Sequence, residues 1–217
     1  MLTFAEEILL LILDDDGSFL PTRGGAVEYI LAGAVLMDLA FANRIDTDLE
    51  HLTCLDATPT GNPILDQALA HIADSSQPKN TRGWIETLAG QDTAEIRQQA
   101  LASLIERGIL ESQDKKFLWV FRARRYPTID GRVEREVRLR ISDVLLSDDI
   151  PDPRDVAMIC LVDASGFLRD IFTARELERA TPRVEQLRKM DLIGHEVGSV
   201  ITEIERSVMM AMAISPH

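Results

Sequence analysis

The sequence predicts a mainly α-helical protein, a single domain of helices around a buried central helix that carries one β-hairpin. Three observations lead to this fold class. Apolar residues recur at helical spacing through most of the chain, and residues 26–43 form a long segment that is apolar on all sides. The segment near residues 109–126 holds the aromatic and aliphatic run of a β-strand, with turn residues after it. The 217 residues contain no internal repeat, so one domain over residues 1–217 is expected.

Capping residues, turn residues and apolar spacing predict the elements in order. Thr3 followed by Glu6 is a capping box that begins a helix, and Asp92 followed by Glu95 is a second such signal. Residues 75–83 are the most linker-like stretch. The expected elements are helices over 4–13 and 26–43, a short β pair within 44–55, helices over 64–73, around Trp84 and over 92–107, the hairpin near 109–126, and helices over 132–146, 156–164, 173–190 and 196–213.

Charge is unevenly distributed along the chain. The protein has 23 basic and 36 acidic residues, which gives a net charge of −13. Residues 115–140 nevertheless hold nine basic residues and only three acidic ones. An anionic surface would be attracted to this segment and repelled by most of the remaining chain, so the pattern is informative about partners.

The hairpin carries the strongest functional signal. Phe117, Trp119 and Phe121 are predicted to share one face of a strand. Five basic residues flank this apolar run, namely Lys115, Lys116, Arg122, Arg124 and Arg125. An exposed run of this kind is typical of a membrane wedge or of a contact between subunits, and a core strand with solvated flanks is the third alternative. Each basic residue near anionic lipid contributes about 1 kcal/mol.

Motifs for catalysis and for metal binding do not stand out. Neither a GxGxxG nor a GxxxxGK loop occurs, and the His51–Cys54 pair has no second pair at zinc-finger spacing. The acids at 14–16 are more typical of a solvated helix end than of a cation site. The glycines at 24–25, beside Arg23, either hold a phosphate at a helix start or form a turn. We therefore expect no enzyme, no cofactor, no metal and no nucleic-acid partner.

Composition also indicates the compartment. Cys54 and Cys160 lie in apolar contexts and are expected to be buried free thiols. Glu6 and Glu7 occupy positions where a signal peptide would be basic, so none is expected. The longest apolar run, 30–42, is shorter than the roughly 20 residues that a membrane-spanning helix needs. A cytoplasmic protein with at most a peripheral membrane role is expected, and the excess of Arg over Lys is typical of a bacterial, GC-rich genome.

Several segments, in their order and spacing, resemble the Golgi phosphoprotein 3 family over essentially the whole chain. They are LTFAEEILLLILDDDG (2–17), DATPTGNPILDQALAHI (56–72), GWIETLAG (83–90), LIERGIL (104–110), FLWVFRARRYPTIDG (117–131) and AMICLVDASGF (157–167). The resemblance implies a helical domain around a buried helix with a protruding hairpin. It also implies peripheral membrane binding through phosphatidylinositol 4-phosphate, self-association through the hairpin, and binding of the cytosolic tails of glycosyltransferases in eukaryotic members.

The family's headgroup pocket maps onto this sequence at four positions. Of two basic residues on the helix before the hairpin, the second corresponds to Arg97 and the first to Ala94. The arginine of the long helix corresponds to Ala32, and the family's tryptophan falls between Leu20 and Arg23, where this chain has none. Arg23 offers a substitute cation in a different place. We therefore expect the hairpin to contribute more to membrane binding than a headgroup pocket does.

Two functions follow as expectations. The first is a non-enzymatic peripheral membrane protein that binds anionic, phosphoinositide-like lipid, with Arg97 and Arg23 on a headgroup phosphate and the hairpin at the membrane. The alternative is a soluble oligomerising adaptor whose hairpin lies between subunits and has no lipid role, which the net charge of −13 favours.

Overall fold

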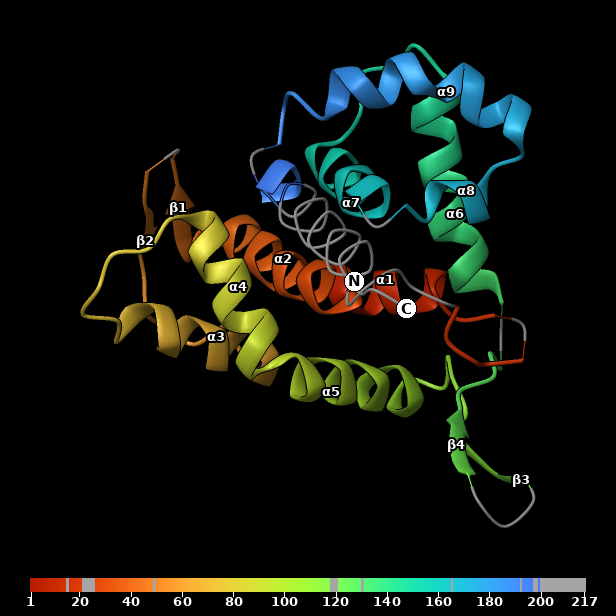
Figure 1. The fold of residues 1–217 in the computed structure, drawn as a ribbon, viewed down its shortest axis with the longest axis horizontal. Coiled ribbons are helices and arrows are strands. Elements are labelled where there is room, and N and C mark those ends of the chain that lie inside the picture. The colour runs from red at the N-terminus through yellow and green to blue at the C-terminus, as the bar shows by residue number, and fades with distance from the viewer. Residues whose placement is uncertain are drawn as a thin grey trace, which may run out of the picture.

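A computed structural model shows how the chain folds (Figure 1). It describes residues 1–14, 16–20, 26–48, 50–117, 121–129, 131–164, 166–191, 193–196 and 199, with backbone only for 114–117 and 121–124. The described elements are α1 (Phe4–Leu11), α2 (Ala26–Phe41), β1 (Ile45–Thr47), β2 (Leu52–Cys54), α3 (Pro63–Ala73), α4 (Thr81–Gln91), α5 (Thr93–Glu106), β3 (Gln113–Phe117), β4 (Phe121–Arg125), α6 (Arg132–Leu146), α7 (Pro153–Ala164), α8 (Leu168–Ile171) and α9 (Ala174–Leu187).

The predicted mainly α fold is confirmed, and α2 is its central helix. Residues all around α2 are buried, from Ile30 to Leu39, because α1, α3, α4, α5 and α7 all contact it. Figure 1 shows α2 in the middle of the molecule, with α3 and α4 on one side and α7 on the other. A helix that is apolar on every side must be surrounded by other helices, since any uncovered face would expose apolar surface to water.

Helix α1 begins as the capping box predicts. The Thr3 hydroxyl accepts from the Glu6 backbone N–H at 3.2 Å, and the Glu6 carboxylate accepts from the Thr3 N–H at 2.7 Å. The helix ends at Leu11, two residues earlier than expected. The chain turns there, because Leu13 and Phe19 pair as an antiparallel bridge and Gly17 adopts a positive φ of 73° between them.

The expected second capping box is wrong, although the helix it was meant to begin exists. Asp92 precedes α5 but makes no side-chain capping bond. It is also the last residue of the turn that ends α4, and its carboxylate points to α3 instead. There it accepts from Gln67 Nε2 at 3.1 Å and lies 3.2 Å from His71 Nδ1. Asp92 therefore ties α3 to the junction of α4 and α5.

The remaining predicted elements are mostly confirmed. The short β pair exists, with Ile45 opposite Cys54 and Thr47 opposite Leu52. Helix α6 has the predicted bounds, and α7 begins three residues early at Pro153, whose fixed φ suits a first helical turn. The stretch 75–83 is partly helical, since the Asn80 side chain caps α4. The predicted helix over 196–213 lies almost entirely outside the described residues.

No helix in the described part of the chain combines the length and the apolar character that crossing a bilayer requires.

Candidate functional site

The hairpin projects from the helical body beyond the end of α5 (Figure 1). Strands β3 and β4 pair antiparallel, with Lys116 opposite Arg122 and Asp114 opposite Arg124. At the foot of the hairpin the chain continues to pair, because Glu111 donates its N–H to the Pro127 carbonyl at 3.0 Å. The basic residues of the hairpin therefore stand on an arm that leaves the body of the protein.

The apolar run is not the single strand that the sequence predicts. Phe117 ends β3 and Phe121 begins β4, and the two residues are directly paired across the hairpin. Residues 118–120, Trp119 among them, join the strands and lie outside the described residues. The prediction was wrong because the run contains no Gly, Pro, Asn or Asp to mark a turn. The exposure of Phe117, Trp119 and Phe121 accordingly stays a prediction.

The structure places most of the predicted basic residues on the hairpin and one on α5. Lys115 and Lys116 lie on β3, and Arg122 and Arg124 lie on β4, with only their backbone described. Arg125 ends β4, and its side chain is described and partly exposed. Arg97 lies on α5, whereas Arg23 and the glycines beside it lie outside the described residues.

A short segment, the collar (residues 16–19), packs against the foot of the hairpin. The Gly17 carbonyl accepts from the Tyr126 N–H at 2.8 Å. A β-carbon on Gly17 would lie 2.2 Å from the backbone of Tyr126 and of Pro127, so only glycine permits this approach. Asp16 Oδ2 accepts from Arg125 Nη1 at 2.9 Å. The collar thus fixes the place where the hairpin leaves the body.

Arg97 reaches the same place from α5. Its guanidinium carbon lies 5.8 Å from the centre of the Phe19 ring, and the Phe19 ring meets the Tyr126 ring edge-on with centres 6.0 Å apart. Cations are attracted to an aromatic face at this range. Among the described residues, the cation–π contact with Phe19 is the one interaction found for the Arg97 side chain. Arg97, Phe19 and Tyr126, together with the collar, are the hairpin base.

Sequence reasoning missed Phe19 and Tyr126. Phe19 meets Arg97, and Tyr126 meets Phe19, through contacts between distant parts of the chain, which no local pattern reports. One signal was present: Phe19 directly precedes positions 20–23, where the resemblance places an aromatic residue of the family's pocket.

Charged side chains also meet inside the protein, in the buried charge cluster (Glu7, Asp38, Arg140 and Arg154). Arg154 donates to the Leu2 carbonyl at 2.7 Å, lies 3.5 Å from Asp38, and covers the Phe4 ring at 3.9 Å. Glu7 is paired at 2.8 Å with Arg140 of α6.

Asp38 is the titrating member of this cluster. Burial raises the pKa of Asp38 to about 7, although the Phe4 N–H, at 2.8 Å, and Arg154 act in the opposite direction. Its partners are the Phe4 N–H of α1 and Arg154 of α7, so Asp38 holds the start of α1 against α2 and α7. The cluster is therefore structural in character.

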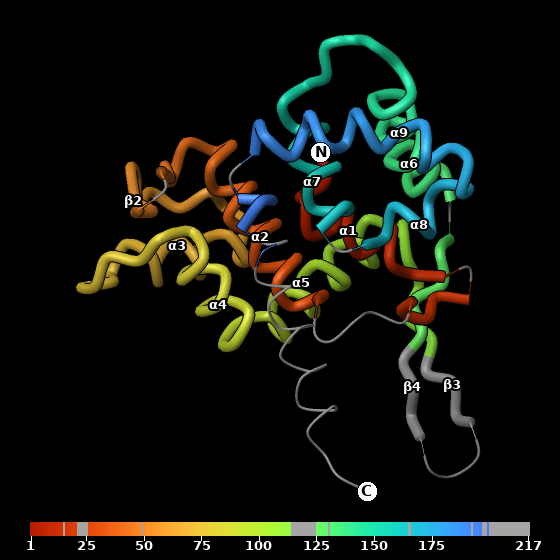
Figure 2. Tube along the Cα trace, turned by 45° about the horizontal axis from the view of Figure 1, so that its top comes forward, coloured from red at the N-terminus to blue at the C-terminus, as the bar shows by residue number. Residues whose placement is uncertain are grey.

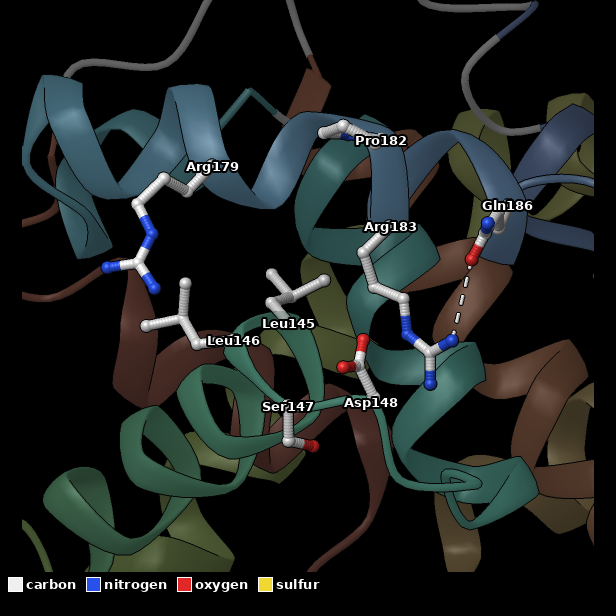
Figure 3. Close-up of a pocket in the computed structure, with 8 residues that line it drawn as sticks. All are labelled: Leu145, Leu146, Ser147, Asp148, Arg179, Pro182, Arg183 and Gln186. Carbon is white, nitrogen blue, oxygen red and sulfur yellow. Dashed lines mark hydrogen bonds between the residues drawn. The ribbon is translucent and has the colours of Figure 1, made fainter.

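A pocket of about 220 Å³ lies where α6 ends against α9 (Figure 3). Its lining residues are Leu145, Leu146, Ser147, Asp148, Arg179, Pro182, Arg183 and Gln186. Arg183 is already engaged, since it donates to the Asp149 carbonyl at 2.5 Å and to Gln186 Oε1 at 3.4 Å. The pocket stands at the opposite end of α6 from the hairpin (Figure 1) and contains none of the predicted site residues.

Described acids of the turn after α1 are bonded within the protein, and the two cysteines are partly or fully buried. Asp14 Oδ1 accepts from the Ser18 N–H at 2.7 Å, and Asp16 is paired with Arg125. Within the described residues, no three His, Cys, Asp or Glu side chains are grouped to hold a metal ion. Cys54 and Cys160 are free thiols, Cys54 only half-buried, and burial raises the pKa of Cys160 to about 12.

The chain as a whole follows the known pattern of a protein family. Figure 2 shows the same arrangement from a second direction, with the helices gathered around α2 and the collar beside the foot of the hairpin. The sequence profile described as Golgi phosphoprotein 3 (GPP34) matches residues 4–204.

Two fungal relatives agree with the profile. The chain is 24% identical to the vacuolar protein sorting-associated protein 74 of Eremothecium gossypii, in an alignment that covers 86% of this chain and 67% of that protein. It is 27% identical to the protein of the same name from Schizosaccharomyces pombe, over 86% of this chain and 66% of that protein. The chain thus spans about two thirds of the length of these relatives. The profile match over nearly all of the described elements shows that the chain belongs to the Golgi phosphoprotein 3 family.

Proposed function

We propose that this chain is a non-catalytic, peripheral membrane protein that binds anionic lipid headgroups, with a preference for phosphoinositides such as phosphatidylinositol 4-phosphate. One observation carries the proposal most directly. Arg97, supported by the Phe19 ring, has no anionic partner among the described residues and lies at the base of the hairpin that carries most of the predicted basic residues.

The hairpin supplies long-range attraction in this proposal. Its five basic residues contribute about 1 kcal/mol each when they lie within a Debye length of an anionic surface. The remaining chain is strongly acidic and is repelled by the same surface. Only an approach with the hairpin end toward the membrane is therefore favourable, and this approach brings Arg97 toward the headgroup layer.

Arg97 supplies the contact with a headgroup in this proposal. A guanidinium offers several N–H donors in a fixed plane, which suits the oxygens of a phosphate. The Phe19 ring limits the directions in which the side chain can point, so less rotamer freedom is lost on binding. Arg23, just before α2, would add a second cation.

Vesicle co-sedimentation tests the proposal. Binding should increase from neutral phosphatidylcholine to vesicles with phosphatidylserine, and again when phosphatidylinositol 4-phosphate is included. Arg97→Gln should weaken binding to the last vesicles about fivefold, the equivalent of about 1 kcal/mol. Arg175→Gln, on the exposed surface of α9, removes the same charge and should leave binding unchanged. Equal and negligible binding to neutral and anionic vesicles would refute the proposal.

A second function has one observation in its favour. The hairpin is a two-stranded sheet, so neither outer edge of β3 or β4 pairs with a further described strand. Open edges are templates for pairing with another chain. A soluble adaptor that oligomerises through the hairpin would use them. Light scattering of Trp119→Asp separates the two functions: dissociation of an oligomer supports the adaptor, and an unchanged mass with lost vesicle binding supports the membrane protein.

A further inference from the structure

The collar contributes an acidic side chain to the same surface that the proposed function requires to be basic. Asp16 and Arg125 form an ion pair with 2.9 Å between Oδ2 and Nη1. The Asp16 side chain is 75% exposed and that of Arg125 is 30% exposed, so an approaching anion can reach both. Arg125 therefore already has an anionic partner when the protein is free in solution.

Backbone contacts on both sides hold this pair in place. Asp14 accepts from the Gly17 N–H at 2.8 Å and from the Ser18 N–H at 2.7 Å, which fixes the turn that presents Asp16. On the other side, Tyr126, next to Arg125, donates its N–H to the Gly17 carbonyl at 2.8 Å. These contacts fix the backbone on both sides and so keep the two side chains within reach of each other.

We propose that Asp16 competes with phosphate anions for Arg125 and thereby sets how much anionic charge a membrane must carry before the protein docks. This inference rests on the proposed function. A phosphate group that binds Arg125 must first displace the Asp16 carboxylate. Exposed ion pairs of this kind are weak, so the competition adjusts the affinity without preventing binding. The ligand chemistry is a phosphate anion, supplied either by a lipid headgroup or by a soluble phosphate.

The experiment compares Asp16→Asn with a control of equal charge, Asp74→Asn. Asp74 is an exposed residue at the end of α3, at the other side of the molecule from the hairpin (Figure 1). On vesicles with phosphatidylserine, Asp16→Asn should bind about two- to fivefold more tightly than Asp74→Asn. It should also reach half-maximal binding at a lower fraction of anionic lipid. If the unchanged protein binds these vesicles, equal affinities for the two variants would overturn the inference, because the effect would then be one of net charge alone.

Making the same two substitutions in an Arg125→Gln protein tests whether Asp16 acts through Arg125. With Arg125 absent, Asp16→Asn should bind no more tightly than Asp74→Asn. If the advantage of Asp16→Asn persists there, Asp16 does not act through Arg125 and the inference is wrong. All of these side chains are exposed or partly exposed, so the variants should unfold at the same temperature as the unchanged protein.

Inorganic pyrophosphate separates this inference from the proposed function. Its binding is followed through the Arg125 Nε–H signal in nuclear magnetic resonance. If the unchanged protein binds no vesicles but Asp16→Asn binds pyrophosphate more tightly than Asp74→Asn, the proposed function fails and the competition stands. If Asp16→Asn binds neither vesicles nor pyrophosphate more tightly than the control, the competition is refuted.

Discussion

Arginines occupy two contrasting environments in this protein. In the buried charge cluster, Arg154 is 15% exposed and contacts Glu7, Asp38, the Leu2 carbonyl and the Phe4 ring. At the hairpin base, Arg97 has an aromatic ring beside it and no described anionic partner, and Arg125 has one exposed partner. The same side chain therefore serves stability in one region and is available for a ligand in the other.

The comparison teaches where to look for function in a chain without catalytic motifs. A buried cation must be fully paired, because an unpaired charge in the interior costs several kcal/mol. A cation that is held in place but left without a partner contributes little to stability, so its position calls for another explanation.

Arg154→Met should destabilise the protein by about 3–5 kcal/mol, because it leaves buried Glu7 and Asp38 short of a positive partner. Urea unfolding measures the loss. Arg175→Met, at an exposed position on α9, is the control and should cost less than about 0.5 kcal/mol. Similar losses in both variants would show that the cluster does not stabilise the fold.

Asp38 should make stability depend on pH. Because its pKa in the folded protein is raised to about 7, the folded state holds a proton there that the unfolded state releases near pH 4. The contribution of Asp38 to stability is therefore greatest below about pH 4 and decreases as pH rises to about 7. The slope is at most about 1.4 kcal/mol per pH unit.

Asp38→Asn should remove this contribution while its side-chain oxygen still accepts from the Phe4 N–H. Urea unfolding between pH 4 and 8 provides the measurement. The free energy of unfolding of the unchanged protein, minus that of Asp38→Asn, should fall from pH 4 to 7 and then level off. A difference that rises with pH would mean that Arg154 outweighs burial and that the pKa of Asp38 is lowered.

Gly17→Ala should destabilise the protein by about 1–3 kcal/mol and displace the foot of the hairpin. The new β-carbon would collide with the backbone of Tyr126 and Pro127, in addition to the strain of a positive φ. Gly61→Ala is a matched control, since Gly61 has a φ of 84° and open space around it. Hydrogen exchange at the Tyr126 N–H should accelerate in Gly17→Ala only.

Phe19→Leu should have the smallest effect. It keeps most of the apolar volume but removes the ring beside Arg97, so binding to anionic vesicles should weaken about two- to fivefold. Combining it with Arg97→Gln should add nothing further. Full additivity of the two changes would show that the ring does not act through Arg97.

The sequence predicts the helical body well because local signals determine it. Apolar spacing alone gave α6 its bounds, and the all-round apolar surface of α2 identified the central helix. Two local predictions were wrong, one because a distant contact prevailed and one because a turn carries no turn residue. Asp92 was expected to cap α5 but binds Gln67 and His71 of α3, and the apolar run at 117–121 folds back on itself although no turn residue marks it.

The candidate site was predictable only in part. Arg97 came from the family resemblance, and the basic flanks of the hairpin came from charge patterning. Phe19, which contacts Arg97, comes from the segment after α1, and Tyr126, which contacts Phe19, comes from the exit of the hairpin, so only the fold brings them together. The pairing of Glu7 with Arg140, 133 positions away, is equally invisible to any local pattern.

Hydrogen exchange of the whole protein with and without vesicles that contain phosphatidylinositol 4-phosphate tests the central claim most directly. The same experiment measures exchange at the hairpin and at the pocket between α6 and α9. We expect new protection in residues 109–129 and in the collar, with none at the pocket between α6 and α9. Protection at that pocket, or an unchanged hairpin under conditions in which vesicles bind, would contradict it.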